Sequence, residues 1–232
     1  MRKYLTFRMV WRVNAVLILV AGAGACIGLG FAAWTFLLGS QAAYRLNDVV
    51  PVEQKGEERW WLGGFEPVAG SGYVVAPVSS MQSYQVGTFG KEASAVRNYL
   101  FVHLADKSSR WLIPHHKGLI VGMERYGAEG LIPGSDSEKR PVKWLVFQIV
   151  PADTNGDKSV TGEDRLVLGV ANADGSHYVE VVKDIDGFLG STWVAGDRLV
   201  LFYTSGGKNV VSEIDLAGRV VVSTKELPKI GG

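Results

Sequence analysis

The chain has few of the residues that build a disulfide scaffold, a zinc site or a nucleic-acid surface. It has one cysteine in 232 residues, so no intrachain disulfide forms and the cysteine content does not indicate a redox compartment. It also lacks a phosphate-binding glycine loop and the cysteine and histidine spacing of zinc sites. Lys and Arg number 24 against 23 Asp and Glu, so no basic excess indicates a nucleic-acid partner.

Charge is absent from residues 13–39, VNAVLILVAGAGACIGLGFAAWTFLLG. A helix of about 20 apolar residues crosses ~30 Å of hydrocarbon, so this segment is predicted to be a transmembrane helix. A signal peptide has an apolar region of only ~7–15 residues, whereas this one continues well past AGAGAC. A lipoprotein is the alternative at Cys26, but Ala23 stands where a lipobox has an aliphatic residue.

The charges around this segment predict its orientation. Lys and Arg stay on the cytoplasmic side of a membrane. The first acid is Asp48, and four basic residues precede the segment: Arg2, Lys3, Arg8 and Arg12. We therefore expect a bacterial inner-membrane protein with a single span, residues 1–12 in the cytoplasm and residues 40–232 in the periplasm.

Small residues recur at a spacing of four within the predicted span. Gly24, Gly28 and Ala32 would lie on one helix face. Such a face lets a second helix approach closely, which drives association in lipid. The pattern predicts packing against another membrane subunit, although glycine and alanine are also common in spans that have no such partner.

The remaining chain is predicted to be a linker, residues 40–65, followed by an all-β domain, residues 66–232. From residue 72, short runs rich in Val, Tyr, Phe, Trp and Leu alternate with Gly, Asp, Asn and Ser, which is typical of strands and turns. One short turn of helix is expected at residues 90–97. The expected hairpins pair 98–104 with 110–113, 165–171 with 177–182, and 198–204 with 209–215. The fold class is therefore mostly β, as an antiparallel meander, a sandwich or a partial propeller-like stack.

Three of these segments are NYLFVHLADKSSRWLIP, LVLGVANADGSHYVEVV and LVLFYTSGGKNVVSEIDL. Over residues 97–225 they resemble the repeats of TolB-type (PD40, WD40-like) β-propellers, in which a strand ends in an Asp-rich turn and a second strand follows. A closed propeller needs about four four-stranded blades, so a smaller domain of similar hairpins is expected. The resemblance implies a binding or scaffolding module.

Residues 153–164, DTNGDKSVTGED, resemble the twelve-residue calcium loop of EF-hands and of similar insertions in TolB-like repeats. Calcium takes about six to eight oxygen ligands, and acids or amides at alternate positions let one loop surround it. The predicted side-chain ligands occupy positions one, three, five and twelve: Asp153, Asn155, Asp157 and Asp164. Ser159, at position seven, would add its backbone carbonyl.

Two residues depart from that pattern. Lys158 stands at position six, where the family has glycine, and Asp164 replaces the usual glutamate at position twelve. The alternative is a hairpin loop without an ion, because Asn, Asp and Gly also favour turns for their own backbone reasons. We expect a structural calcium ion that clamps the loop.

No catalytic residues are predicted. His115 and His116 are adjacent, so on a strand they would point to opposite faces and could not easily share a metal. No serine lies in a GxSxG setting. The predicted function is a non-enzymatic accessory or scaffold subunit of a membrane protein complex, with membrane subunits as partners. The alternative is a membrane-tethered periplasmic module that binds a ligand or peptide, and a hydrolase is less favoured.

Overall fold

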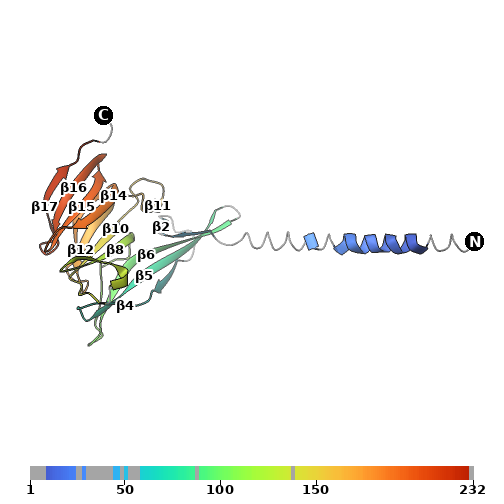
Figure 1. Ribbon diagram of the computed structural model, residues 1–232, viewed down its shortest axis with the longest axis horizontal. Coiled ribbons are helices and arrows are strands. Elements are labelled where there is room, and N and C mark those ends of the chain that lie inside the picture. The colour runs from blue at the N-terminus through green and yellow to red at the C-terminus, as the bar shows by residue number, and fades with distance from the viewer. Residues whose placement is uncertain are drawn as a thin grey trace, which may run out of the picture. The chain divides into compact units, whose positions relative to one another are not determined.

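The computed structural model describes residues 9–24, 28–29, 44–47, 50–51, 58–86, 89–136 and 139–229 (Figure 1). Antiparallel strands dominate it, which confirms the prediction of a mostly β chain. The N-terminal helix and the bulk of the strands belong to two separate compact units.

The N-terminal unit contains a helix at residues 9–24, with residues 28–29 also helical. In the described part of the chain, no helix combines the length and the apolar character needed to cross a membrane. Residues 25–27 and 30–39 of the predicted span lie outside the described residues, and they include Cys26 and Ala32.

The first sheet follows the order β1-β6-β5-β3, with β4 also paired to β5 and β7 also paired to β6. Three of its strands lie within or next to residues 40–65, the range predicted as a linker. The residues of these strands are therefore part of a β-sheet. The strands are β1 (Tyr44–Asn47), β3 (Glu58–Leu62), β4 (Glu66–Val68), β5 (Tyr73–Val86), β6 (Phe89–His103) and β7 (Ser109–Trp111).

The short helical turn expected at residues 90–97 is wrong. These residues lie within β6, which pairs with β5 and β7. Their sequence, GKEASAVR, favours helix when read locally, but pairing with neighbouring strands overrides a weak local propensity. The predicted hairpin that follows is confirmed, because Leu100 pairs with Trp111 and Val102 with Ser109.

The second sheet has the order β13-β12-β10-β8-β9 and is buried on both faces. Along β10, Leu145, Phe147 and Ile149 belong to one hydrophobic cluster, while Val146 and Val150 belong to the other. This alternation follows from the period of two in a strand. The strands are β8 (Leu119–Gly127), β9 (Gly130–Ile132), β10 (Trp144–Val150), β12 (Leu166–Asn172) and β13 (Val179–Ile185), and the 3₁₀ helix η1 (Gly134–Asp136) follows β9.

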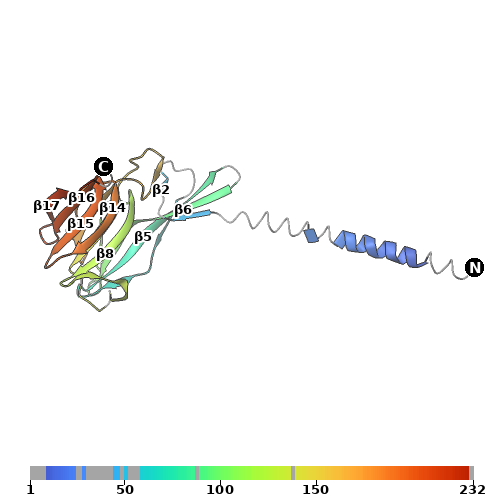
Figure 2. The same ribbon diagram turned by 45° about the horizontal axis from the view of Figure 1, so that its top comes forward.

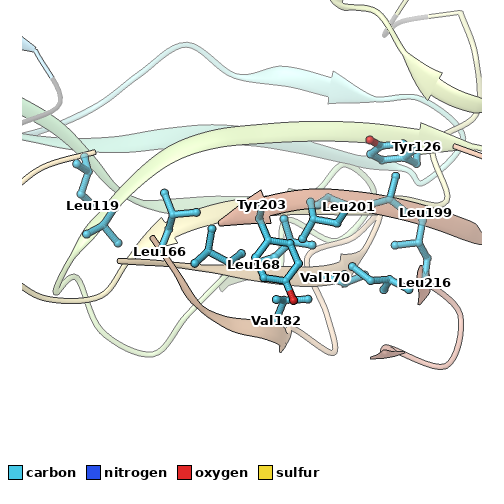
Figure 3. Close-up of a cluster of buried hydrophobic side chains, with 14 of the residues drawn as sticks. Leu119, Tyr126, Leu166, Leu168, Val170, Val182, Leu199, Leu201, Tyr203 and Leu216 are labelled. Carbon is cyan, nitrogen blue, oxygen red and sulfur yellow. The ribbon is translucent and has the colours of Figure 1, made fainter. Parts of the chain in front are cut away.

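The third sheet is a four-stranded meander, β14-β15-β16-β17. Leu199, Leu201 and Tyr203 of β15 pack with β12 residues such as Leu168 and Val170 in one cluster (Figure 3). The second sheet thus lies between the first and the third, as both views show (Figures 1 and 2). The strands are β14 (Gly187–Trp193), β15 (Arg198–Ser205), β16 (Lys208–Asp215) and β17 (Val220–Glu226).

A two-stranded pair holds one part of residues 153–164, the predicted calcium loop, which we call the acidic loop. β2 (Val50–Pro51) pairs with β11 (Ser159–Val160), so Ser159 lies opposite Pro51. Val50 and Val160 are both buried in the cluster between the second and third sheets. The loop is therefore attached to the core at position eight, where an EF-hand loop also carries an aliphatic residue.

Candidate functional site

The acidic loop is folded by its own side chains. Asp153 accepts hydrogen bonds from the backbone N–H of Gly156 at 2.7 Å and of Lys158 at 3.0 Å. Lys158 has φ of 68°, in the left-handed region that favours glycine. It therefore adopts the kind of turn for which the calcium-loop family uses glycine at this position.

Asn155 and Asp157 repeat this arrangement one step further along the loop. Asn155 Oδ1 accepts the N–H of Asp157 at 2.9 Å, and Asp157 Oδ1 accepts the N–H of Ser159 at 2.8 Å. Both side chains are exposed. A carboxylate or amide oxygen carries two lone pairs, so each of these oxygens keeps capacity for a further partner.

Asp164 differs from the other predicted ligands because its carboxylate is fully buried. Oδ1 accepts the N–H of Thr154 at 2.7 Å, the N–H of Asn155 at 3.1 Å and the hydroxyl of Thr154 at 3.1 Å. Oδ2 accepts the N–H of Thr161 at 2.9 Å. Burial alone would raise the pKa of Asp164, but the donors on Thr154, Thr161 and Asn155 together hold the pKa below its usual range.

The predicted calcium ligands therefore do not all fit an ion equally well. Asp164 is occupied by four hydrogen-bond donors and closes the loop on itself. Asp153, Asn155, Asp157 and the Ser159 carbonyl remain as predicted ligands. No group of three or more His, Cys, Asp or Glu side chains is placed to hold a metal in the ranges that the structure covers. Calcium binding stays a prediction, with four protein groups in place of five.

A second candidate site is an open groove of about 630 Å³ between β7 and the turn that joins β12 to β13. One wall carries Arg110 and Trp111, and the other carries Ser176, His177 and Tyr178. We call it the turn groove. It lies where a hairpin of the first sheet meets a hairpin of the second.

Two turns of the same design border the turn groove. Asp106 accepts both the N–H and the hydroxyl of Ser108, at 2.9 and 2.8 Å. Asp174 does the same with Ser176, at 2.9 and 2.6 Å. The residue between Asp and Ser has positive φ in both turns, 63° at Lys107 and 75° at Gly175. Sequence analysis missed this groove, although the repeated quartets ADKS and ADGS, at 105–108 and 173–176, were a signal that could have located it.

Close contacts hold the two walls in place. Arg110 forms an ion pair with Asp174 at 3.6 Å, which links the hairpins directly. A Cβ at Gly175 would collide with the ring of Phe101, so only glycine lets this turn sit so close to β6. Hydrogen bonds from Ser176 and the charge of Arg110 outweigh burial and lower the pKa of Asp174.

No protein-family model matches the chain, and no curated protein matches it. Among solved structures, the β-propeller domain of the Trilobed protease from Pyrococcus furiosus, described as having an open velcro topology, aligns at 12% identity with a TM-score of 0.34. The alignment covers 73% of this chain and 43% of that one, so the chain spans less than half the length of that structure.

Of the predicted helix-packing positions, Gly24 ends the helix at residues 9–24 and Gly28 belongs to the helical residues 28–29. A Cβ built on Gly24 or Gly28 would meet no atom of the described chain within 4 Å. Ala32 lies outside the described residues. Packing of this face against a partner helix stays a prediction.

The adjacent histidines have different surroundings. The His116 ring lies 4.8 Å from the Trp111 ring, edge to face, and 5.6 Å from the Trp60 ring. Its Nδ1 lies 3.2 Å from the side-chain amide nitrogen of Asn98. His115 instead accepts the N–H of Lys117 at 3.4 Å. His116 therefore serves as a packing residue that braces Trp111 at the edge of the turn groove.

Proposed function

We propose that this chain is a non-enzymatic, single-pass accessory or scaffold subunit of a bacterial membrane protein complex, with its β domain in the periplasm. The observation that supports it is the helix at residues 9–24. Its large apolar side chains between Met9 and Val20 are 53% to 73% exposed. Exposed apolar surface on this scale is unfavourable in water and favourable in lipid or against another apolar helix. The three sheets would act as propeller-like blades that present a surface to the partner.

The orientation can be measured with reporter fusions. Alkaline phosphatase joined after residue 232 is expected to be active, because it folds after export and the positive-inside rule places the C-terminus outside. A cytoplasmic reporter at the same position should be inactive. The matched control lacks residues 13–39 and should reverse both results. An active cytoplasmic reporter on the intact chain would refute the proposed topology.

Docking through the helix face can be tested by substitution. Gly24→Leu with Gly28→Leu should strongly reduce recovery of partner subunits in mild detergent, because leucine prevents the close approach of two helices. Membrane insertion should be unchanged. Ile18→Leu, which changes shape but not size on the same helix, is the matched control. If the double variant recovers every partner at the level of Ile18→Leu, the glycines are not part of an interface.

The second candidate function is a membrane-tethered module that binds a ligand or peptide with its β domain. The turn groove favours it, because the groove combines aromatic and polar side chains in a concave site whose volume is typical of small-ligand pockets. The two functions are compatible, since an accessory subunit can also carry a ligand.

A further inference from the structure

We propose that the turn groove is a binding site for a neutral or acidic saccharide. The groove of about 630 Å³ lies within the ~300–1,000 Å³ range of small-molecule sites. A sugar ring has apolar C–H faces and a rim of hydroxyl groups. A site that recognises it therefore needs a flat aromatic surface beside hydrogen-bonding groups.

Trp111 supplies the aromatic surface. Its side chain lines the groove and is 44% exposed, while the edge-to-face contact with His116 holds the ring in place. An indole combines a large apolar face with an N–H donor, which suits a ligand that is apolar on its faces and polar at its rim. A partly exposed tryptophan that is already fixed loses little conformational entropy when a ligand covers it.

Hydrogen-bonding groups surround this surface. Ser109 and His177 line the groove and can donate to or accept from hydroxyl groups, whereas the Ser176 hydroxyl already donates to Asp174 at 2.6 Å. Arg110 is held between Asp174 at 3.6 Å and the ring of Tyr73, 5.9 Å from its guanidinium carbon. The Arg110 side chain is still 43% exposed, so some of its five N–H donors face solvent.

The charge of the lining favours one class of saccharide. Arg110 is the charged residue among the described side chains that line the groove, and its Nη1 pairs with Asp174, which borders the groove, at 3.6 Å. The guanidinium N–H groups that point away from Asp174 can donate to a carboxylate or to neutral hydroxyls. A uronate or an uncharged N-acetylated sugar would therefore be preferred to a cationic amino sugar.

A peptide is less well suited to this site. Peptides that bind by strand addition need an extended, unpaired sheet edge. In the described part of the chain the groove is lined by one strand, β7, which is three residues long. The opposite wall is a turn in which His177 has φ of 55°, so it cannot act as a strand template.

The test uses the full-length chain in mild detergent and two probes, tri-N-acetylchitotriose and trigalacturonic acid, measured by calorimetry. At least one should bind saturably, and Trp111→Ala should weaken that binding about tenfold or more. Arg110→Gln should weaken trigalacturonic acid more than tri-N-acetylchitotriose. Trp61→Ala is the matched control, because Trp61 is 42% exposed and is not among the groove residues, so it should leave binding unchanged.

Several results would overturn the proposal. One is no saturable binding of either probe up to about 10 mM, a concentration that would reveal even millimolar affinity. A second is equal losses in Trp111→Ala and Trp61→Ala. A third is binding of a trialanine peptide in place of both sugars. Melting curves establish that each variant is folded, and Trp111→Phe, which keeps a ring in the groove, replaces Trp111→Ala if the alanine variant unfolds. Binding in this assay does not depend on membrane anchoring, so its failure would leave the proposed topology standing.

Discussion

Replacing Asp164 with alanine is expected to lower the free energy of unfolding by about 3 kcal/mol. The substitution removes one buried carboxylate that accepts backbone N–H groups from Thr154, Asn155 and Thr161. Each donor left without a partner in a buried site costs about 1–3 kcal/mol, and water entering the loop would recover part of that loss. Urea unfolding of the full-length chain, followed by circular dichroism, measures the change.

Asp157→Ala is the matched control for this experiment. Asp157 is an acid of the same loop, but it is exposed and accepts a single backbone N–H, from Ser159 at 2.8 Å. Its removal should cost about 1 kcal/mol or less. Equal losses in the two variants would mean that burial of Asp164 does not organise the loop.

Asp164 also predicts that the stability of the folded chain depends on pH. The pKa of Asp164 is lower in the folded chain than the value of about 3.9 for an unfolded aspartate. Its contribution to stability is therefore complete above the unfolded pKa and is lost as the pH falls through the folded pKa. Below about pH 4, wild-type stability should fall more steeply than that of Asp164→Asn, which cannot titrate at this position. Parallel curves would contradict this assignment.

Calcium is expected to raise the melting temperature of the wild-type chain by roughly 5–10 °C at a hundredfold excess over its dissociation constant. Binding to the folded state alone contributes about 2.7 kcal/mol at that ratio. We propose Asp153, Asn155, Asp157 and the Ser159 carbonyl as the groups that hold the ion. Thermal unfolding in calcium and in chelator measures the difference.

Asp153→Ala with Asp157→Ala should abolish the calcium effect, because both charged ligands of the proposed set are lost. Magnesium is the control ion, since it demands stricter octahedral geometry and should stabilise the chain less. Identical melting temperatures in calcium and in chelator, with no binding heat up to about 10 mM calcium, would mean that the loop binds no calcium and is only a turn held by Asp164.

The hairpins were predictable because their information is local. The pairs predicted around residues 172–175 and 205–208 are both present, with Val170 opposite Val179 and Ser205 opposite Lys208. Asp-Gly and Gly-Gly sequences favour the positive φ values that these turns require. The helical turn predicted at residues 90–97 was wrong because the strand pairing there is not local. A weak helical preference in these residues is overridden by pairing with neighbouring strands, which the local sequence does not show.

The candidate sites divide in the same way. The alternating acids of residues 153–157 and the uncharged run at residues 13–39 are properties of the sequence by itself, because spacing and composition define them. Tertiary structure alone decided that Asp164 turns inward to accept N–H groups, and that Arg110 meets Asp174 across the turn groove. Arg110 and Asp174 come from hairpins far apart in the chain. The donors to Asp164 lie within its own loop, but the spacing of acids in that loop does not show which of them is buried. The sequence determines the chemistry of each side chain, but the burial and the neighbours of that side chain follow from how the sheets pack.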